Sequence, residues 1–398
     1  MNHLLFLSHC VPAPPDKGEK IRAYHEIQQL ASRYRIHLVC FARNRSEVQA
    51  AQELSKACAS VYAEQMAPRW ALAGAAARFA LGDSLNEAFY SSKKMHRHVQ
   101  SLAREVPFNA TIAYSVVMAP YAPPRLPMLL DMIDVDSEKW FQYARSRRPR
   151  VLFRLEARRL RRFETRWAES AQRVALTTEN EEQLLKTFAP KAVTFSIENG
   201  VDSSFFDGGA HDIPAELAGR PFVAFVGTMD YHPNIEAACW FARCVLPELR
   251  RRDPALEFFI VGRNPSSEVS RLERIEGVHV TGSVSDTRPY LASARAIVVP
   301  LRVARGIQNK VLEALAMGRP VFTTLEVCQT FGSAPPAGVV CCASEEEFVG
   351  RVSAACRIEP QCDSSIRAET CRRFSWARME LVLAAQLDHV AGSANAAS

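Results

Sequence analysis

Hydrophobic and polar positions follow a repeating order along the chain, in which a short apolar run precedes an amphipathic stretch. The runs are rich in Val, Ile, Leu and Phe, and apolar residues in the stretches recur every three or four positions, as at Ile21, Tyr24, Ile27, Leu30 and Ala31. Apolar strands that alternate with helices form parallel sheets buried on both faces. The pattern therefore predicts an α/β chain of the doubly wound, Rossmann-like kind.

The predicted strands fall into two blocks. The first block has runs at Leu4–Ser8, Ile36–Phe41, Thr111–Tyr114, Met128–Ile133, Val174–Thr177 and Val193–Ile197. The second block has runs at Pro221–Gly227, Leu256–Val261, Val278–Thr281, Ala296–Pro300, Pro320–Thr323 and Val339–Cys342. We therefore expect two doubly wound parallel-sheet domains that face a central cleft.

The segment between the blocks, Asp202–Gly219, contains Gly208, Gly209 and Pro214, which is typical of a linker. A chain of 398 residues is also too long for one ordinary core. We predict an N-terminal Rossmann-like domain at residues 1–205 and a C-terminal one at residues 206–373. An amphipathic helix at residues 374–392 and a short flexible tail should follow.

The segment Ser146–Arg173 differs from the rest because it is a long helical pattern dense in arginine. The arginines are Arg147, Arg148, Arg150, Arg154, Arg158, Arg159, Arg161, Arg162 and Arg166, and the apolar stripe is Leu152, Leu155, Leu160, Phe163 and Trp167. A basic amphipathic helix can lie on an anionic membrane with its arginines at the lipid phosphates. The same stripe fits a helix that packs on its own domain with a charged outer face, so both interpretations remain open.

Charge, cysteine usage and hydropathy exclude several other classes. A net charge of +6 suits acidic ligands but does not indicate nucleic-acid binding, and we expect no nucleic-acid partner. Eleven cysteines without C-x-x-C spacing predict buried, reduced thiols rather than a disulfide framework or a metal site. The first apolar run is too short for a signal peptide, and no stretch of about 18 apolar residues occurs. We expect a cytoplasmic protein, soluble or peripheral to the membrane.

Two familiar phosphate-binding motifs are missing from the sequence. There is no G-x-G-x-x-G after the first strand and no G-x-x-x-x-G-K-[ST], which disfavours dehydrogenases of the Rossmann class and P-loop proteins. Instead, the loop PAPPDKGEKIR follows the first strand, and its Lys17 and Gly18 lead directly into a helix. A glycine there lets the backbone approach a ligand, toward which the following amides point.

Polar and glycine residues follow four consecutive strands of the second block. Parallel sheets bind ligands at the carboxyl ends of their strands, so we expect a ligand cleft at this edge. The residues predicted to line it are Gly227, Thr228, Arg263, Thr281, Gly282, Val284 and Arg302.

The stretch ARGIQNKVLEALAMG, from Ala304 to Gly318, completes the same edge with a predicted helix that stops at Gly318. Its first amides, at Gly306, Ile307 and Asn309, should form an anion site. Arg305 and Lys310 add positive charge where a diphosphate could accept it, and we take both as candidate catalytic residues. Glu313 lies further along the helix, where it could accept a hydrogen bond from a sugar or ribose hydroxyl.

Several stretches together carry a resemblance to a known family. They are PPDKGEKIRAYH, DMIDVDSEKW, ENGVDSSFF, FVGTMDYHPNIEA, VTGSVSDTRPYL, PLRVARGIQNKVLEALAMGRPV and FSW, and they extend from about residue 4 to residue 376. The chain resembles GT-B glycosyltransferases of glycosyltransferase family 4, and most of all sugar transferases associated with PEP-CTERM/exosortase systems. The resemblance implies a nucleotide-sugar donor on the second domain, an acceptor on the first, and no cofactor.

The resemblance also implies roles for individual residues. The second glutamate of the family's E-x7-E motif falls at Glu313, which should hold the donor ribose, whereas Arg305 stands where the first glutamate is expected. Gly18 corresponds to a glycine that approaches the donor phosphates, and the segment from Thr281 to Val284 to one whose backbone contacts the base. Family members usually retain the anomeric configuration without an obvious enzyme nucleophile.

Asp134 and Asp136 form a D-x-D sequence, which in another glycosyltransferase fold holds a divalent ion. Here they follow a strand of the first domain, away from the predicted donor half, and we expect no metal. Either one of them faces the acceptor and orients or deprotonates its hydroxyl, or Asp136 and Ser137 cap the next helix. His9 and His25 could likewise face the cleft or be structural.

We take as the leading hypothesis a metal-independent hexosyltransferase in exopolysaccharide biosynthesis. It would use a UDP- or GDP-linked sugar and a saccharide or lipid-linked saccharide acceptor, at the inner face of the cell membrane. A nucleotide-sugar epimerase of the GT-B type and a non-catalytic subunit that binds nucleotide or saccharide remain alternatives, the latter because Arg305 replaces a glutamate.

Overall fold

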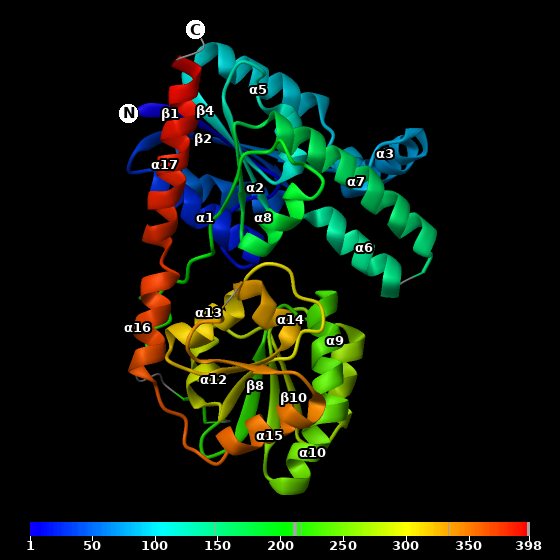
Figure 1. Cartoon of the computed structure of the whole chain (residues 1–398), viewed down its shortest axis with the longest axis vertical. Coiled ribbons are helices and arrows are strands. Elements are labelled where there is room, and N and C mark those ends of the chain that lie inside the picture. Colours follow the sequence, from blue (N-terminus) through cyan, green and yellow to red (C-terminus); the bar gives the residue numbers. More distant parts are fainter. Residues whose placement is uncertain (147, 210–212, 216, 333, 396–398) are drawn as a thin grey trace. The chain divides into compact units, whose positions relative to one another are not determined.

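The computed structural model describes residues 1–146, 148–209, 213–215, 217–332 and 334–395, so Arg147 of the arginine-rich segment lies outside the described residues (Figure 1). The chain divides into two compact units. The first consists of Met1–Glu198 together with Trp376–Ser398, and the second of Asn199–Ser375. The C-terminal helix therefore belongs to the first unit, although the whole second unit separates it from the rest of that unit in sequence.

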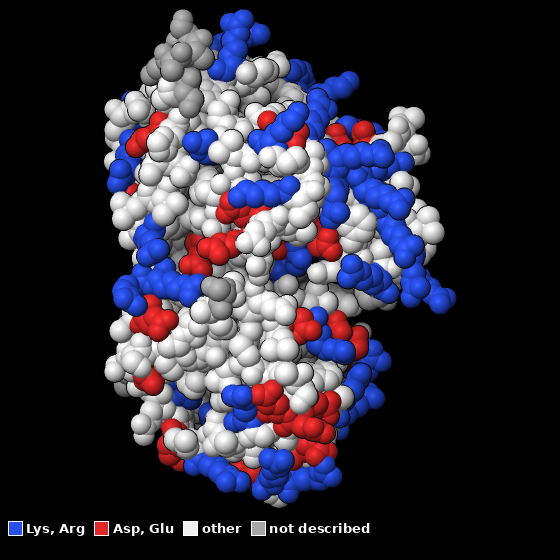
Figure 2. All heavy atoms as spheres, in the orientation of Figure 1, with Lys and Arg blue, Asp and Glu red and all other residues white. Residues whose placement is uncertain are grey.

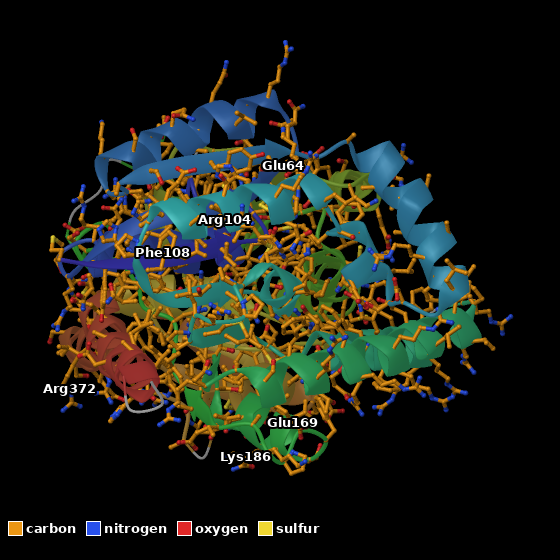
Figure 3. All side chains as sticks on the ribbon, turned by 90° about the horizontal axis from the view of Figure 1, so that it is seen from above. Glu64, Arg104, Phe108, Glu169, Lys186 and Arg372 are labelled. Carbon is orange, nitrogen blue, oxygen red and sulfur yellow. A yellow bond between two sulfur atoms is a disulfide. The ribbon has the colours of Figure 1, made fainter. Side chains whose placement is uncertain are left out.

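The first unit contains a sheet of seven parallel strands in the order β3-β2-β1-β4-β5-β6-β7. The strands are β1 (Asn2–Ser8), β2 (Tyr34–Ala42), β3 (Ser60–Gln65), β4 (Phe108–Tyr114), β5 (Met128–Ile133), β6 (Arg173–Leu176) and β7 (Thr194–Ser196). All six predicted strands of this block are confirmed, and β3 is an addition. Glu64 marks this edge strand in Figure 3. Its residues are half-buried or exposed, so the apolar run that reveals the other strands is missing.

The second unit contains a sheet of six parallel strands in the order β10-β9-β8-β11-β12-β13. These are β8 (Phe222–Val226), β9 (Glu257–Val261), β10 (Val278–Gly282), β11 (Ala296–Val299), β12 (Val321–Thr324) and β13 (Val339–Cys342). Each one lies at a predicted run. The prediction of two parallel α/β sheets is therefore confirmed.

Helices connect successive strands in both units (Figure 1). The first unit has α1 (Gly18–Leu30), α2 (Arg45–Ala51), α3 (Pro68–Leu81), α4 (Leu85–Phe89), α5 (Lys93–Glu105), α6 (Asp136–Ser146), α7 (Arg150–Ser170), α8 (Glu179–Lys186) and α17 (Trp376–Asn395). The second has α9 (His232–Trp240), α10 (Leu246–Arg252), α11 (Ser267–Ser270), α12 (Arg288–Ser293), α13 (Asn309–Ala316), α14 (Leu325–Cys328), α15 (Glu345–Ala355) and α16 (Ser364–Arg373). Short 3-10 or π turns occupy η1 (Gln52–Lys56), η2 (Val116–Tyr121), η3 (Phe241–Val245), η4 (Arg271–Arg274) and η5 (Gln329–Phe331).

Successive residues of each strand face opposite layers of helices. Leu4 and Phe6 of β1 pack in a cluster with residues of α1 and α17, whereas Leu5 and Leu7 pack with residues of α5 and α7. In Figure 3, Arg104 marks α5 and Glu169 marks α7. Because side chains alternate across a strand, a run that is apolar at every position must be covered on both sides.

Several helices begin with a side-chain N-cap whose residue types can be recognised in the sequence. Ser84, Thr178 and Ser344 each accept a hydrogen bond from the amide of a glutamate three residues later, as in a capping box. In contrast, α1, α9 and α13, which follow β1, β8 and β11, begin without a side-chain hydrogen bond from the residue at the cap position. The first amides of these three helices are therefore not satisfied by that residue.

The cysteine prediction needs one correction. Cys328, at the end of α14, and Cys341, in β13, form a disulfide with their Cα atoms 6.1 Å apart. The fold brings these two residues together through the pairing of β12 with β13, which the sequence spacing does not reveal. Nine other cysteines are free thiols, and most of them are buried or half-buried. Within the part of the chain that the structure describes, no helix is long and apolar enough to cross a membrane.

A buried ionic cluster joins α1 to β5 inside the first unit. Nε and Nη2 of Arg22 donate to Oδ2 of Asp131 at 2.9 and 2.8 Å, and Nη1 donates to the Ile197 carbonyl. Glu26 lies one helical turn from Arg22, with 3.0 Å between Nε and Oε1. Burial and the neighbouring Asp131 raise the pKa of Glu26 well above its usual value, which favours its neutral form. Two hydrogen bonds join the charged partners Arg22 and Asp131.

We predict that Arg22→Met lowers the free energy of unfolding by about 3–5 kcal/mol, because it leaves the buried Asp131 carboxylate without its cation. Arg22→Met/Asp131→Asn removes both charges and keeps an acceptor for the Ile133 amide, so it should recover most of this loss. Urea unfolding followed by circular dichroism measures both values. A double variant as unstable as the single one would instead show that lost packing of Arg22 sets the cost.

Candidate functional site

The strand order reverses once in each sheet, between β1 and β4 in the first unit and between β8 and β11 in the second. At such a point the two flanking connections leave in opposite directions, and the carboxyl ends of the strands border a crevice. The uncapped helices α1, α9 and α13 all begin at these points. The fold therefore provides one candidate binding edge in each unit.

In the second unit, α13 begins later than the sequence suggested. We expected helix-start amides from Gly306 to Asn309, but the helix begins at Asn309. Gly306 has φ +61°, a left-handed conformation that a helix does not accept, and Gln308 is extended. The Gln308 side chain folds back and donates to the carbonyls of Arg305 and Gly306, so it fixes the loop instead of capping the helix. The end is as predicted, because Gly318 has φ +69° and Arg319 N bonds to Ala314 O, which completes a Schellman motif.

Lys310 is the residue that joins the two sides of this crevice. Its Nζ donates to Oδ1 of Asn234 in α9 at 2.6 Å and lies 4.8 Å from the centre of the Phe225 ring in β8. The Asn234 amide in turn donates to the Thr228 carbonyl at 2.9 Å. A Cβ added to Gly227 would lie 2.9 Å from both Lys310 Nζ and Asn234 Nδ2. The glycine therefore leaves the space that the ammonium occupies.

Backbone hydrogen bonds tie the neighbouring strand ends together. Gly227 N donates to Val261 O at 2.9 Å, and Gly262 N donates to Gly282 O at 3.2 Å. A Cβ on Gly262, whose φ is +149°, would lie 1.7 Å from Gly227 O, so the two backbones approach as only glycine permits. The predicted residues at the ends of β8, β9 and β10 thus form one continuous edge.

The remaining predicted donor residues lie near this edge but contribute differently. Arg302 is exposed after β11 and Arg305 is half-buried beside Gly306. Ile307 is only 5% exposed and belongs to the core, and Val284 packs against the same core, so only their backbones can face a ligand. Asn309 accepts a hydrogen bond from the buried Asn199 at 3.2 Å. The Thr281 hydroxyl donates to the Gly282 carbonyl, and Met229 N bonds to Arg263 O.

Lys310 and Glu313 lie three residues apart on one face of α13, and their surroundings bring their pKa values together. Burial lowers the pKa of Lys310 to about 7, although Glu313 opposes the shift. Burial raises the pKa of Glu313 to about 7, although Lys310 opposes that shift. Near neutral pH the pair can therefore lose or gain charge readily. An anion at the helix start would favour protonated Lys310 and neutral Glu313.

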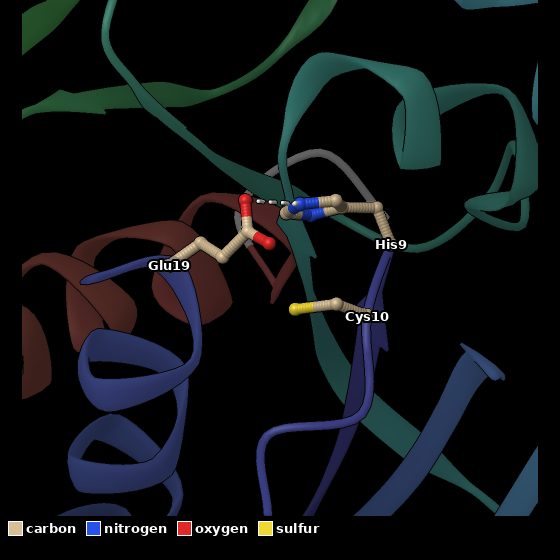
Figure 4. Close-up of side chains that lie close together, drawn as sticks. All are labelled: His9, Cys10 and Glu19. Atoms are coloured by element: carbon tan, nitrogen blue, oxygen red, sulfur yellow. Dashed lines mark ion pairs between the residues drawn. The ribbon is translucent and has the colours of Figure 1, made fainter. Parts of the chain in front are cut away.

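In the first unit, His9 and Glu19 meet at the corresponding reversal point (Figure 4). Nε2 of His9 lies 3.7 Å from Oε2 of Glu19, and its ring stacks on Tyr114 and meets the edge of Tyr90. Arg43 Nη2 lies 3.6 Å from the other oxygen of Glu19. Burial alone would raise the pKa of Glu19, but His9 and nearby cations lower it to about 2, so Glu19 is ionised. The site combines aromatic rings with charges of both signs.

Among the described residues, one group has metal-ligand atoms close enough together to hold a metal ion. It consists of His9, Cys10 and Glu19, whose ligand atoms lie within 4.8 Å of one another. The donor set fits a metal poorly. Burial and the charge of Glu19 raise the pKa of Cys10 to about 12, so the thiol stays protonated. Arg43 already neutralises Glu19. We derive no chemistry from a metal here.

Two other predicted residues flank this region of the first unit. Lys17 stands at the cap position of α1 in an extended conformation without a side-chain hydrogen bond to the helix, and Gly18 begins the helix. Their amides lie at the uncapped helix start after β1. His25 does not join them, because its ring stacks on Trp376 of α17 at 4.2 Å. That stacking fits the structural interpretation of His25.

Buried carboxyl groups hold the loop that carries Asp134 and Asp136. Oxygens of Asp131, Glu181 and Glu164 accept hydrogen bonds from three alternate amides, those of Ile133, Val135 and Ser137, at 2.8–2.9 Å. Ile133 has φ +67°, a strained value for a β-branched residue, and such strain persists only where the surroundings impose it.

Within that loop, Asp134 accepts a hydrogen bond from the Thr177 hydroxyl at 2.7 Å. Lys139 lies 3.7 Å from Asp134 and 2.9 Å from Asp136, and α6 begins at Asp136. The two carboxylates therefore share an ammonium group. This contact suits a structural role for Asp136 and leaves Asp134 partly neutralised.

Three residues of these two edges were not assigned from the sequence: Asn234, Glu19 and Arg43. Asn234 and Glu19 each lie in the first turn of a helix that follows a strand end, close to the predicted residues Thr228 and Gly18. That position in the sequence is the feature from which they could have been predicted. Arg43 follows β2, and no local pattern connects it with Glu19.

We predict that Gly227→Ala weakens binding of a diphosphate anion such as pyrophosphate by at least about tenfold, because the new methyl group displaces Lys310 and Asn234 from the crevice. Both displaced atoms are side-chain ends, so thermal stability should change little. Gly350→Ala is the control, since its Cβ would meet nothing within 4 Å. Titration calorimetry measures the affinities, and equal affinity in both variants would contradict the assignment of this edge.

Comparisons with known proteins agree with the fold described above. Residues 220–355 match the family model for Glycosyl transferases group 1. No curated protein sequence matches the chain.

Among solved structures, sucrose-phosphate synthase from Thermosynechococcus elongatus is similar with a TM-score of 0.70 at 17% identity, over 98% of this chain and 100% of that one. HepE from Anabaena, in complex with UDP and glucose, gives a TM-score of 0.66 at 14% identity, over 98% and 100%. WaaG, a glycosyltransferase involved in lipopolysaccharide biosynthesis, gives 0.57 at 14%, over 95% and 94%. The chain therefore has the GT-B fold, and residues 220–355 of its second unit match the model for Glycosyl transferases group 1.

Proposed function

We propose that the protein transfers a hexose from a UDP- or GDP-linked sugar to a saccharide or lipid-linked saccharide acceptor in exopolysaccharide biosynthesis. The reaction is independent of metal and retains the anomeric configuration. The nucleotide-sugar binds to the second unit, and the acceptor binds to the first. The observation that carries the proposal is the position of Lys310, at an uncapped helix start and beside the glycine edge of a strand-order reversal.

The donor diphosphate fits this edge because two kinds of positive charge converge there. Free amides at a helix start and the helix dipole attract anions, and Lys310 adds a positive charge when it is protonated. Gly227 and Gly262 let the backbone approach the phosphates without a side chain in the way. HepE, which shares the fold, has been solved with UDP and with UDP-glucose, which supports a donor of this class.

The chemistry asked of this edge is stabilisation of the leaving group. Cleavage of a glycosyl–phosphate bond leaves negative charge on the nucleotide, and positive groups placed there lower the barrier. Lys310 and Arg305 take this role, and Glu313 binds the ribose. Because fixed cations serve the phosphates, no divalent ion is needed, and Lys139 already occupies the position between Asp134 and Asp136.

The acceptor site is assigned to the strand-order reversal of the first unit. Tyr90 and His9 offer rings on which a sugar can stack, and the ionised Glu19 and nearby Arg43 can hold its hydroxyls. Asp134 lies on a rigidly held loop after β5 and could orient the acceptor hydroxyl. A lipid-linked acceptor would bring the enzyme to the inner face of the cell membrane, where the arginines of α7 meet anionic headgroups.

We predict that UDP-glucose binds about tenfold more tightly at about pH 6 than at about pH 8.5. Lysine is charged when protonated, so with a pKa of about 7 the Lys310 ammonium forms as the pH falls, while Glu313 loses its charge in the same range. The donor's own diphosphate does not titrate there. Calorimetry across this pH range should show that the affinity of Lys310→Met for UDP-glucose does not vary with pH. If the variant kept the pH dependence of the wild type, Lys310 would be excluded from the phosphate site.

The donor and the reaction can be tested together. We screen UDP, GDP and their sugars by thermal shift, then measure hydrolysis and transfer with the stabilising donor and several acceptors, and determine the product anomer by NMR. Stabilisation by a nucleotide without turnover would favour a binding subunit, and an altered sugar without transfer would favour an epimerase.

Two variants test the residues. Glu313→Ala should raise the Kd of the donor about tenfold, and Arg305→Glu should lower kcat on the order of a hundredfold because it places an anion beside the leaving diphosphate. The exposed Glu326→Ala and Arg274→Glu, in the same unit, serve as matched controls. Unchanged kinetics in Arg305→Glu would remove Arg305 from the site.

A further inference from the structure

Helix α3 in the first unit is apolar on all sides and yet largely exposed. From Ala71 to Leu81 it contains a single charged residue, Arg78, which pairs with Asp83 beyond the helix end at 2.6 Å. Leu72 is 60% exposed and Leu81 is 87% exposed. The other exposed positions are Ala73, Gly74, Ala76, Ala77 and Ala80. A surface helix normally turns a polar face to water, and a helix without one normally lies in an apolar environment.

Beside α3 lies the most basic helix of the chain. Arg150, Arg154, Arg158, Arg162 and Arg166 recur every fourth residue of α7, and all five are exposed. At 1.5 Å per residue they form a row of about 24 Å. Figure 2 shows Lys and Arg side chains gathered over this part of the unit.

Like charges four residues apart destabilise a helix slightly, and an anion bound beside this row would offset that cost. In the described part of the chain, no carboxylate lies within ion-pair distance of Arg150, Arg154, Arg158 or Arg162. The arginines on the flanks differ, since Arg161 pairs with Glu138 at 2.8 Å. The row is therefore available to bind an external anion.

The apolar helix and the arginine row are parts of one surface. Arg159 of α7 donates to the Phe79 and Asp83 carbonyls at the end of α3, and its guanidinium lies 4.3 Å from the centre of the Phe79 ring. This contact fixes the C-terminal end of α3 against the middle of α7, as Figure 1 shows. At the start of α7, Val151 is 75% exposed and Leu152 is 52% exposed, which adds apolar area next to the arginines.

We propose that α3 inserts its apolar face into an anionic lipid surface while the arginine row of α7 binds the headgroups. The charges of the row complement anionic lipids, and α3 needs an apolar medium, which lipid supplies and which nucleic acid does not. With 14 residues, α3 is too short to span a bilayer, so it lies in the interface. The inference rests on the proposed membrane location and adds that hydrophobic insertion by α3, not charge alone, holds the enzyme there.

The test is co-sedimentation of the full chain with vesicles of phosphatidylcholine containing about one third phosphatidylglycerol. Leu72→Asp should weaken binding on the order of tenfold or more. Leu381→Asp is a matched control, because Leu381 is 61% exposed on α17 of the same unit, and it should bind within about twofold of the wild type.

Charge is tested separately with Arg158→Ala/Arg162→Ala against Arg97→Ala/Arg104→Ala, which removes two exposed arginines from α5. The α7 double variant should lose on the order of tenfold, and the loss should shrink at about 0.5 M NaCl, whereas the effect of Leu72→Asp should persist. Thermal melting checks that each variant folds, and if Leu72→Asp does not, Leu81→Ser replaces it.

Three results would overturn the proposal. The first is no vesicle binding by the wild type at low salt. The second is loss of binding only in the α7 variant, which would leave charge as the sole anchor. The third is light scattering that shows a dimer dispersed by Leu72→Asp, which would make α3 an interface between two copies. None of these depends on the proposed reaction, because hydrolysis of the donor and transfer to a water-soluble acceptor are measured without vesicles.

Discussion

The hydrogen bond between the Lys310 ammonium and Asn234 joins the helix after β11 to the helix after β8, at the point where the strand order of the second sheet reverses. The arrangement is possible because Gly227 leaves room for the ammonium and Gly262 for the Gly227 carbonyl. Burial weakens the charges of Lys310 and Glu313 in the free protein, whereas each of the two groups favours the charged form of the other. The same burial would strengthen their interaction with an anion bound at the start of α13, because a low local dielectric increases each electrostatic interaction.

The first unit also has a reversal of strand order in its sheet, but different side chains lie at that point. Its reversal point carries His9, Glu19 and aromatic rings in addition to Lys17 and Gly18 at the start of α1, so charges of both signs lie beside aromatic surfaces. Deeper in the unit, Arg22 and Asp131 connect α1 to β5, and Asp131 also holds the amide of Ile133. The buried ion pair thereby links the helix that follows β1 to the loop that carries Asp134. Burial of the Arg22–Asp131 pair costs desolvation energy, but the pair holds α1 and the loop after β5 together.

Charge is distributed unevenly over the first unit, and the unevenness has a structural reason. Arginines of α7 that face α6 or α3 have partners, as Arg161 and Arg159 do, whereas no carboxylate of the described residues lies within ion-pair distance of Arg150, Arg154, Arg158 or Arg162. A net charge of +6 is thus a poor guide to function, since much of the basic surface lies on one helix beside an apolar one. The position of an arginine on the helix, rather than the net charge of the chain, shows whether it packs against the protein or is available to bind an anion.

The sequence by itself determined the two parallel sheets and the strand-end edges that we propose as binding sites, because buried strands such as Met128–Ile133 are apolar at nearly every position. It missed β3, whose exposed side lacks that signal, and it placed the start of α13 too early, since the positive φ of Gly306 is not a local preference that the pattern displays. Only the tertiary structure decided that Lys310 meets Asn234, that Arg43 faces Glu19 and that Cys328 reaches Cys341. The local pattern of hydrophobic and polar residues indicates which segments are buried. Contacts between segments far apart in the sequence depend on how the sheets and helices pack together.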